Sequence, residues 1–115
     1  MKVDVSEVGA RPTILTPARM NAPQGARVLA DVIHDLDFAD YCLLVLDWEK
    51  NVLAVVATKR YPDIRRRADI DFIVDMDDAF TKDNFGLEVA KNIVDHLREE
   101  FEKKDAEAKA MEGRA

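Results

Sequence analysis

The stretch that decides the fold is DIDFIVDMD, residues 69–77. Its apolar side chains, at positions 70, 72, 74 and 76, stand at every second place, and aspartates fill all but one of the places between them. A β-strand sends successive side chains to opposite faces, so the pattern predicts a strand over 69–77 with one apolar and one acidic side. Only Ile73 interrupts the acidic row.

A helix from Asp63 to Phe80 is the alternative interpretation of this region. Apolar residues also recur there at spacings of three or four, as on one face of a helix: Ile64, Ala68, Phe72, Met76 and Ala79. The strand is favoured because its alternation is tighter and because four interior aspartates are poor helix formers. The expected extended conformation of Asp71 and Phe72 is therefore the assumption on which the remaining predictions depend.

Two apolar runs precede this strand. YCLLVLDW, residues 41–48, and VLAVVATKR, residues 52–60, are separated only by Glu49, Lys50 and Asn51, which predicts a β-hairpin. Both runs are nearly continuous in leucine and valine, so they should be covered on both faces. With the strand over 69–77 they predict a three-stranded antiparallel meander, because the links are too short for a crossover.

Helical periodicity flanks the predicted sheet on both sides. Asn21, Ala22 and Pro23 start a helix over about 23–37. A second helix, capped by Asp83 or Asn84, has an apolar stripe made of Phe85, Val89, Ala90, Ile93, Val94, Leu97 and Phe101. The predicted fold class is therefore α+β, with the element order α-β-β-β-α and an N-terminal arm.

The expected domain organisation is an arm, one domain and a tail. Residues 1–22 form the arm, in which residues 13–15 are at most a short edge strand because Pro12 and Pro17 bracket them. Residues 23–103 form a single α+β domain. Residues 104–115 form a charged helix extension or tail that frays into solvent.

The composition of the 115 residues restricts the class of partner. A formal net charge of −6 argues against general affinity for nucleic acid or anionic membranes and favours basic proteins as partners. The single cysteine, Cys42, cannot form an intrachain disulfide and is expected to be a buried thiol in a reducing compartment. With no apolar run of signal-peptide or membrane-span length, the expected location is cytoplasmic.

The candidate partner-binding residues are charged groups and one aromatic. They are Asp69, Asp71, Asp75, Asp77 and Asp78 from the acidic row, Arg65, Arg66 and Arg67 from the preceding link, and Trp48 at a strand end. The aspartates fit a solvated face, a protein-binding surface or a cation site. Alternate strand residues lie roughly 6.6 Å apart, too far for neighbours in one row to chelate a small ion unaided. The basic link likewise fits a solvated loop or a contact with phosphate or an acidic partner.

Two enzyme-like arrangements are incomplete. Residues 73–82, IVDMDDAFTK, are similar to the acidic loop of phosphoribosyltransferases, but Lys82 stands where that loop needs glycine. A nuclease-like magnesium site would use Asp47 and Lys59, but Ala57 occupies the place of the second acid. No serine or cysteine lies in a recognisable nucleophile turn. We therefore predict no catalytic residue, metal or cofactor.

Three functions follow, in order of preference. The first is a small acidic, non-enzymatic interaction or regulatory module that self-associates as a homo-oligomer. The hairpin is apolar on both faces, and the two predicted helices could cover one face or one each, so a second copy could supply any cover that is missing. The second is an acidic mimic of nucleic acid that inhibits a basic nucleic-acid-binding protein. The third is a metal-dependent nuclease-like enzyme using Asp47, Asp77, Asp78 and Lys59.

Overall fold

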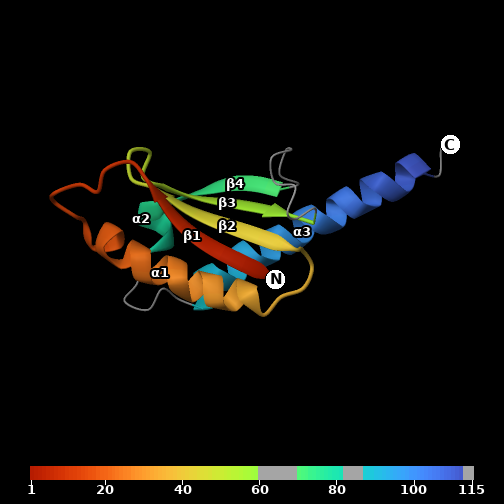
Figure 1. Ribbon diagram of the computed structural model, residues 1–115, viewed down its shortest axis with the longest axis horizontal. Coiled ribbons are helices and arrows are strands. Elements are labelled where there is room, and N and C mark those ends of the chain that lie inside the picture. The colour runs from red at the N-terminus through yellow and green to blue at the C-terminus, as the bar shows by residue number, and fades with distance from the viewer. Residues whose placement is uncertain (60–69, 82–86, 113–115) are drawn as a thin grey trace.

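A computed structural model describes residues 1–59, 70–81 and 87–112, which form a four-stranded mixed sheet with helices (Figure 1). The elements in chain order are β1 (Lys2–Val8), α1 (Pro17–His34), β2 (Tyr41–Asp47), β3 (Val52–Thr58), β4 (Ile70–Asp75), α2 (Met76–Ala79) and α3 (Leu87–Glu112). The α+β class is as expected.

The sheet is not a purely antiparallel meander of three strands, as the sequence had suggested. Its order is β1-β2-β3-β4, in which β2, β3 and β4 pair antiparallel but β1 runs parallel to β2. Parallel neighbours need a long crossover, and the segment containing α1 supplies it. The expectation was wrong because it considered only the short links that follow residue 41.

Residues 2–8 therefore belong to the sheet, whereas the sequence had suggested an arm. The amino group of Met1 also donates hydrogen bonds to the carbonyl oxygens of His34 at 2.8 Å and Leu36 at 2.6 Å. Gly9 turns the chain away from the sheet with a φ of +80°, a conformation that L side chains rarely adopt. No strand forms over residues 13–15, where only a short edge strand had been considered.

Helix α1 begins at Pro17, six residues earlier than expected. The Thr16 side chain caps it by accepting a hydrogen bond from the Arg19 backbone N–H at 3.3 Å. Proline is well suited to the first helical position, where an N–H has no partner within the helix. Pro23 lies inside the helix, and the buried residues Ala22 and Ala26 around it are fully covered. The helix ends at His34 rather than at residue 37.

The strand over 70–75 is confirmed, and the helix expected as its alternative is wrong there. Within residues 70–81, helix appears only over Met76–Ala79. The strand ends two residues earlier than predicted because the Asp75 carboxylate accepts hydrogen bonds from the backbone N–H groups of Asp77 at 2.8 Å and Asp78 at 3.3 Å. This is an N-cap, so it starts a helix.

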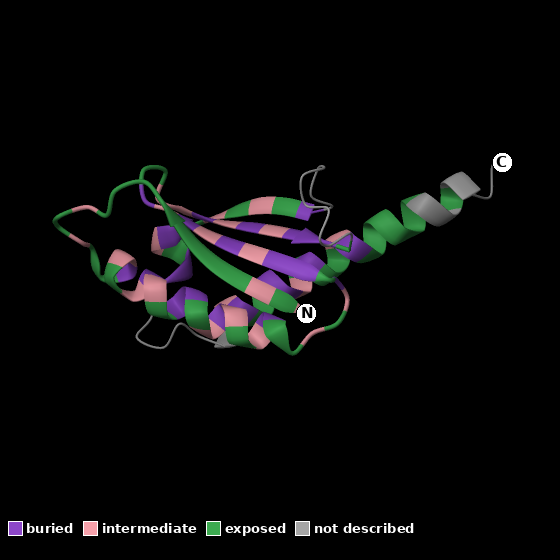
Figure 2. Cartoon of the chain, in the orientation of Figure 1, coloured by how far each residue is buried: buried purple, intermediate pink, exposed green. Residues whose placement is uncertain are grey.

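Helix α3 carries the expected apolar stripe, of which Ala90, Ile93, Val94, Leu97 and Phe101 are buried. Its expected caps, together with Phe85, lie outside the described residues. The helix continues to Glu112, and its described side chains beyond Phe101 are exposed where it passes the end of the sheet (Figure 2). Within the described ranges, every helix is too short or too polar to span a membrane.

The described helices α1, α2 and α3 lie on the same side of the sheet, below it in Figure 1. We call that side the covered face. Register places these residues on it: Val3, Val5 and Glu7 of β1, Cys42, Leu44 and Leu46 of β2, Leu53, Val55 and Ala57 of β3, and Ile70, Phe72 and Val74 of β4. The side chains at its centre, including Leu44, Leu53 and Val55, are fully buried. The main core thus lies between the sheet and the helices.

The neighbouring valines Val55 and Val56 test this assignment, because they point to opposite faces of β3. Val55→Ala should lower the free energy of unfolding by about 2–3 kcal/mol because it leaves a cavity in a closed core. Val56→Ala, on the partly exposed face, should cost less than about 1 kcal/mol. Urea unfolding followed by circular dichroism measures both, and equal losses would contradict the one-sided covering.

Candidate interaction surface

The side of the sheet opposite the helices, which we call the open face, is apolar at its centre. The apolar residues on it are Val8, Leu43, Val45, Val52, Ala54, Val56 and Ile73. Ile73 is 68% exposed and Val8 is 44% exposed, while the others are partly exposed. A solvated antiparallel sheet normally carries polar side chains on its outer face, so this surface is unusual.

At one end of the open face the central side chains are buried. Tyr41 and Thr58 face each other in this end row and are both buried, while Lys2 of β1, in the same row, is exposed. The Tyr41 hydroxyl donates a hydrogen bond to Asp4 Oδ2 at 2.8 Å. The accessible apolar part of the face therefore begins at the next row, which starts with Asp4.

Carboxylates border this apolar centre on both edges. Register aligns Asp4 of β1, Leu43, Val56 and Asp71 of β4 in a single row across the sheet. Asp47 and Asp75 lie two rows further along, on β2 and β4. We call Asp4, Asp47, Asp71 and Asp75 the acid rim. The open face thus combines an apolar centre with negative charge at its margins.

The structure separates the predicted acidic row into two groups. Asp71 and Asp75 lie exposed on the open face of β4. Asp77 lies on α2, where its Oδ2 accepts a hydrogen bond from Asn51 Nδ2 at 2.8 Å. Asp78 is also on α2 and is exposed. The predicted binding residues Asp69, Arg65, Arg66 and Arg67 lie outside the described residues.

Asp77 has a structural role at the hairpin tip. Its partner Asn51 has a φ of 55°, and the Asn51 Oδ1 atom accepts a hydrogen bond from Arg19 Nε at 3.0 Å. The Met76 backbone N–H donates to the Asn51 carbonyl at 2.9 Å. These bonds connect the β2–β3 turn to α1 and α2. Asp77 is therefore engaged in a hydrogen bond within the protein and is less available to a partner.

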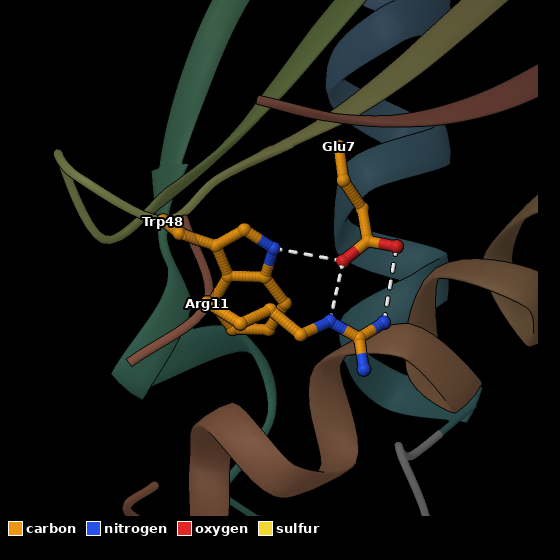
Figure 3. A network of polar contacts seen from close by, with 3 residues as sticks. All are labelled: Glu7, Arg11 and Trp48. Carbon is orange, nitrogen blue, oxygen red and sulfur yellow. Dashed lines mark hydrogen bonds and ion pairs between the residues drawn. The ribbon is translucent and has the colours of Figure 1, made fainter. Parts of the chain in front are cut away.

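Trp48, another candidate partner-binding residue, is also engaged in contacts within the protein, as Figure 3 shows. Its ring is buried, with 4% of the residue exposed, and its Nε1–H donates to Glu7 Oε1 at 2.8 Å. Arg11 donates to both Glu7 carboxylate oxygens, at 2.8 and 3.0 Å, and its guanidinium carbon lies 5.5 Å from the Trp48 ring centroid. This group, the Glu7 cluster, attaches the end of β1 to the end of β2.

The nuclease-like pair is not assembled in the structure. Asp47 Oδ1 accepts hydrogen bonds from the backbone N–H groups of Glu49 and Lys50 at the hairpin tip. Lys59 follows the other end of β3 and pairs with Asp105 at 2.9 Å. In the described ranges, no group of three or more His, Cys, Asp or Glu side chains is placed to hold a metal ion.

Cys42 is buried on the covered face, as expected. Burial raises the pKa of its thiol to about 12, so almost none of it is thiolate at neutral pH. A nucleophilic role needs the thiolate and access to a substrate. Cys42 therefore acts as a small apolar core residue.

Two surface cavities flank α3. One of about 590 Å³ lies between the 36–40 link and α3, and its cations are already engaged: Lys59 with Asp105, and Arg98 over the Phe38 ring. The other, of about 390 Å³, lies between β4 and α3, where the Phe72 and His96 rings meet edge to face. Neither gathers a set of polar groups that points to a particular ligand.

Comparison with known proteins finds no match: no family model fits the chain, and no curated protein or solved structure is significantly similar to it. The candidate surface therefore rests on geometry alone. Sequence reasoning missed its individual apolar residues, although the two-sided hydrophobicity of 41–60 was the signal for them. It missed Asp4 because β1 was not recognised.

The contacts of the Glu7 cluster lead to a testable prediction about the pKa of Glu7. The Arg11 hydrogen bonds, helped by the one from Trp48, hold the pKa of Glu7 below its ordinary value of 4.5. A lowered pKa in the folded state stabilises the protein above pH 4.5, and this contribution is lost as the pH falls through the folded-state pKa.

Arg11→Met should therefore raise the Glu7 pKa towards 4.5, as measured by carboxyl ¹³C NMR titration. Lys59→Met, which removes a cation from the distant Asp105 pair, is the control and should leave the Glu7 pKa unchanged. An equal shift in both variants would mean that general charge, not the Arg11 contact, sets this pKa.

Proposed function

We propose that this protein is a non-enzymatic interaction module that binds another protein on the open face of its sheet. The observation that supports this most is the one-sided position of the described helices on a hairpin that is apolar on both sides. Contiguous exposed apolar surface with a polar border is typical of protein-interaction sites. The acid rim gives this surface such a border.

The structural roles of several described polar side chains support a non-enzymatic function. Asp75 caps α2, Asp77 holds the hairpin tip, and Cys42 is a buried neutral thiol. An active site instead brings together titratable groups with shifted pKa values in a cleft. The Glu7 carboxylate has a lowered pKa, but its hydrogen bonds to Arg11 and Trp48 explain that shift as structural.

Self-association through this face stays a prediction, and the acid rim opposes it. Two aligned twofold arrangements can stack one open face on another. In the first, β1 of one copy lies over β4 of the other, which places Asp4 near Asp71 of the second copy. In the second, each strand lies over the same strand of the other copy, running in the opposite direction. This places Asp71 near Asp75 of the second copy. Both arrangements bring like charges together at an interface, which is unfavourable.

An acidic mimic of nucleic acid is the second candidate function. The exposed Asp71 and Asp75 on β4 favour it, because neither pairs with a described cation, although Asp75 also caps α2. The acid rim would favour a basic partner in both functions, but the two predict a different dependence of binding on salt. A contact made only by carboxylates would vanish at high salt, whereas the apolar centre retains its contribution.

Site-specific photo-crosslinking in the cells that naturally make the protein tests the proposed function. A photoreactive amino acid replaces Ala54 at the centre of the open face, and in a matched variant it replaces Asp31, which is exposed on α1. We expect a discrete adduct from position 54 and none from position 31.

The adduct mass identifies the kind of partner. An adduct of twice the 13.0 kDa chain mass would show a second copy, and any other discrete mass a different protein. Absence of an adduct at position 54, or equal adducts at both positions, would overturn the proposal that this face is a docking surface.

A further inference from the structure

The centre of the open face offers a partner only side chains. Strands β2 and β3 pair with neighbours on both of their edges, so their backbone groups are used within the sheet. A segment that lies on this apolar centre must satisfy its own N–H and C=O groups, because an unpaired polar group placed there is costly. An α-helix does this within itself, and an isolated extended segment does not.

The width between the two edges of the acid rim fits one helix. Asp4 and Asp71 stand at the ends of one row that crosses three strand-to-strand spacings, roughly 14 Å in total. An α-helix with its side chains is about 10–12 Å across. Lysine and arginine side chains on its flanks can extend their charged ends outward to reach carboxylates on both edges.

The length and relief of the surface fit a short helical contact. From the row of Asp4 to the row of Val8 the strands rise roughly 13 Å, which corresponds to about nine residues of helix. The central side chains Val45 and Ala54 are short, which allows a helix to approach closely. Such a contact is small, so it should be weak and reversible.

We infer that the open face binds a cationic amphipathic α-helix of another protein, laid along β2 and β3 between Asp4 and Asp71. Its apolar stripe would cover Val45 and Ala54, and basic residues on both flanks would pair with the acid rim. The net charge of −6 favours the approach of such a segment. Binding would add a helix layer to the face of the sheet that the described helices leave uncovered. The inference rests on the proposed function and names the chemistry of its partner.

The probe for this inference is a designed fluorescein-labelled peptide of about 18 residues, roughly 27 Å long as a helix. It carries one stripe of leucines flanked on both sides by lysines. A control peptide has the same composition with the leucines distributed around the helix. Fluorescence anisotropy with the full chain should show saturable binding of the striped peptide in the micromolar range, and weaker binding of the control peptide.

Matched protein variants locate the binding site. Asp4→Asn with Asp71→Asn should weaken binding of the striped peptide about three- to tenfold at low salt and flatten its salt dependence. The amide oxygen of an asparagine at position 4 can still accept the Tyr41 hydrogen bond, so the sheet edge is retained. The control, Asp31→Asn with Asp35→Asn on exposed positions of α1 and its C-cap, makes the same change in net charge and should alter binding less than about twofold.

Val45→Thr with Ile73→Thr tests the apolar contribution. Threonine keeps the β-branched shape that suits a strand, and circular dichroism verifies that the variant is folded. Binding should weaken at both low and high salt, because burial of apolar surface does not depend on charge.

The outcomes separate the inference from the proposed function. Equal binding of both peptides, or equal effects of the two aspartate pairs, would mean nonspecific charge attraction and would overturn the inference. A position-54 adduct without peptide binding, or an adduct of twice the chain mass, would overturn the helix inference and leave the docking surface intact. If the variant with the photoreactive amino acid at position 54 gives no adduct, the proposed function itself is overturned.

Discussion

The burial of one face of the β2–β3 hairpin under α1 and α3 is the interaction on which the rest of the structure depends. Leu44, Leu46, Leu53 and Val55 are fully covered there, and each such side chain contributes about 1.5–3 kcal/mol to folding. The hairpin also holds β1 on one edge and β4 on the other, so it positions both halves of the acid rim. Strand alternation then places the remaining apolar side chains of the hairpin on the opposite side, where no described helix reaches them.

The parts of this fold that could be predicted from the sequence are those specified by local periodicity. The three antiparallel strands and the buried stripe of α3 follow from spacings of two and of three or four residues. Strand β1 was missed because its parallel partner is reached only through α1, although Val3 and Val5 alternate with polar residues. The start of α1 was misplaced because residues 16–17 and 21–23 both carry start signals, and only the burial of Ala18 and Ala22 selects the earlier one.

The candidate site was predictable in kind but not in composition. Two-sided hydrophobicity in residues 41–60 indicated that both faces of the hairpin need cover and left open whether the two helices supply it; in the structure the described helices cover one face. Which side chains share a row depends on strand register, which places Asp4 opposite Asp71. Aspartates that look alike in the sequence also have different roles: Asp77 bonds Asn51, whereas Asp71 faces outward. Local patterns cannot distinguish these roles because they depend on contacts between distant segments.

The outer edge of β4 and the open face of the sheet differ in how their carboxylates affect association with another chain. In the described residues β4 has a neighbour only on its β3 side, so its other edge presents backbone groups that an identical strand could extend. In an antiparallel pair centred on Ile73, Asp71 of one strand would oppose Asp75 of the other, and like charges directly across a strand pair are destabilising. These two carboxylates therefore oppose pairing of this edge with the same edge of a second copy. On the face, the same carboxylates border an apolar surface. Under the proposal made above, the charges that oppose strand pairing at the edge would attract a basic helix to the face.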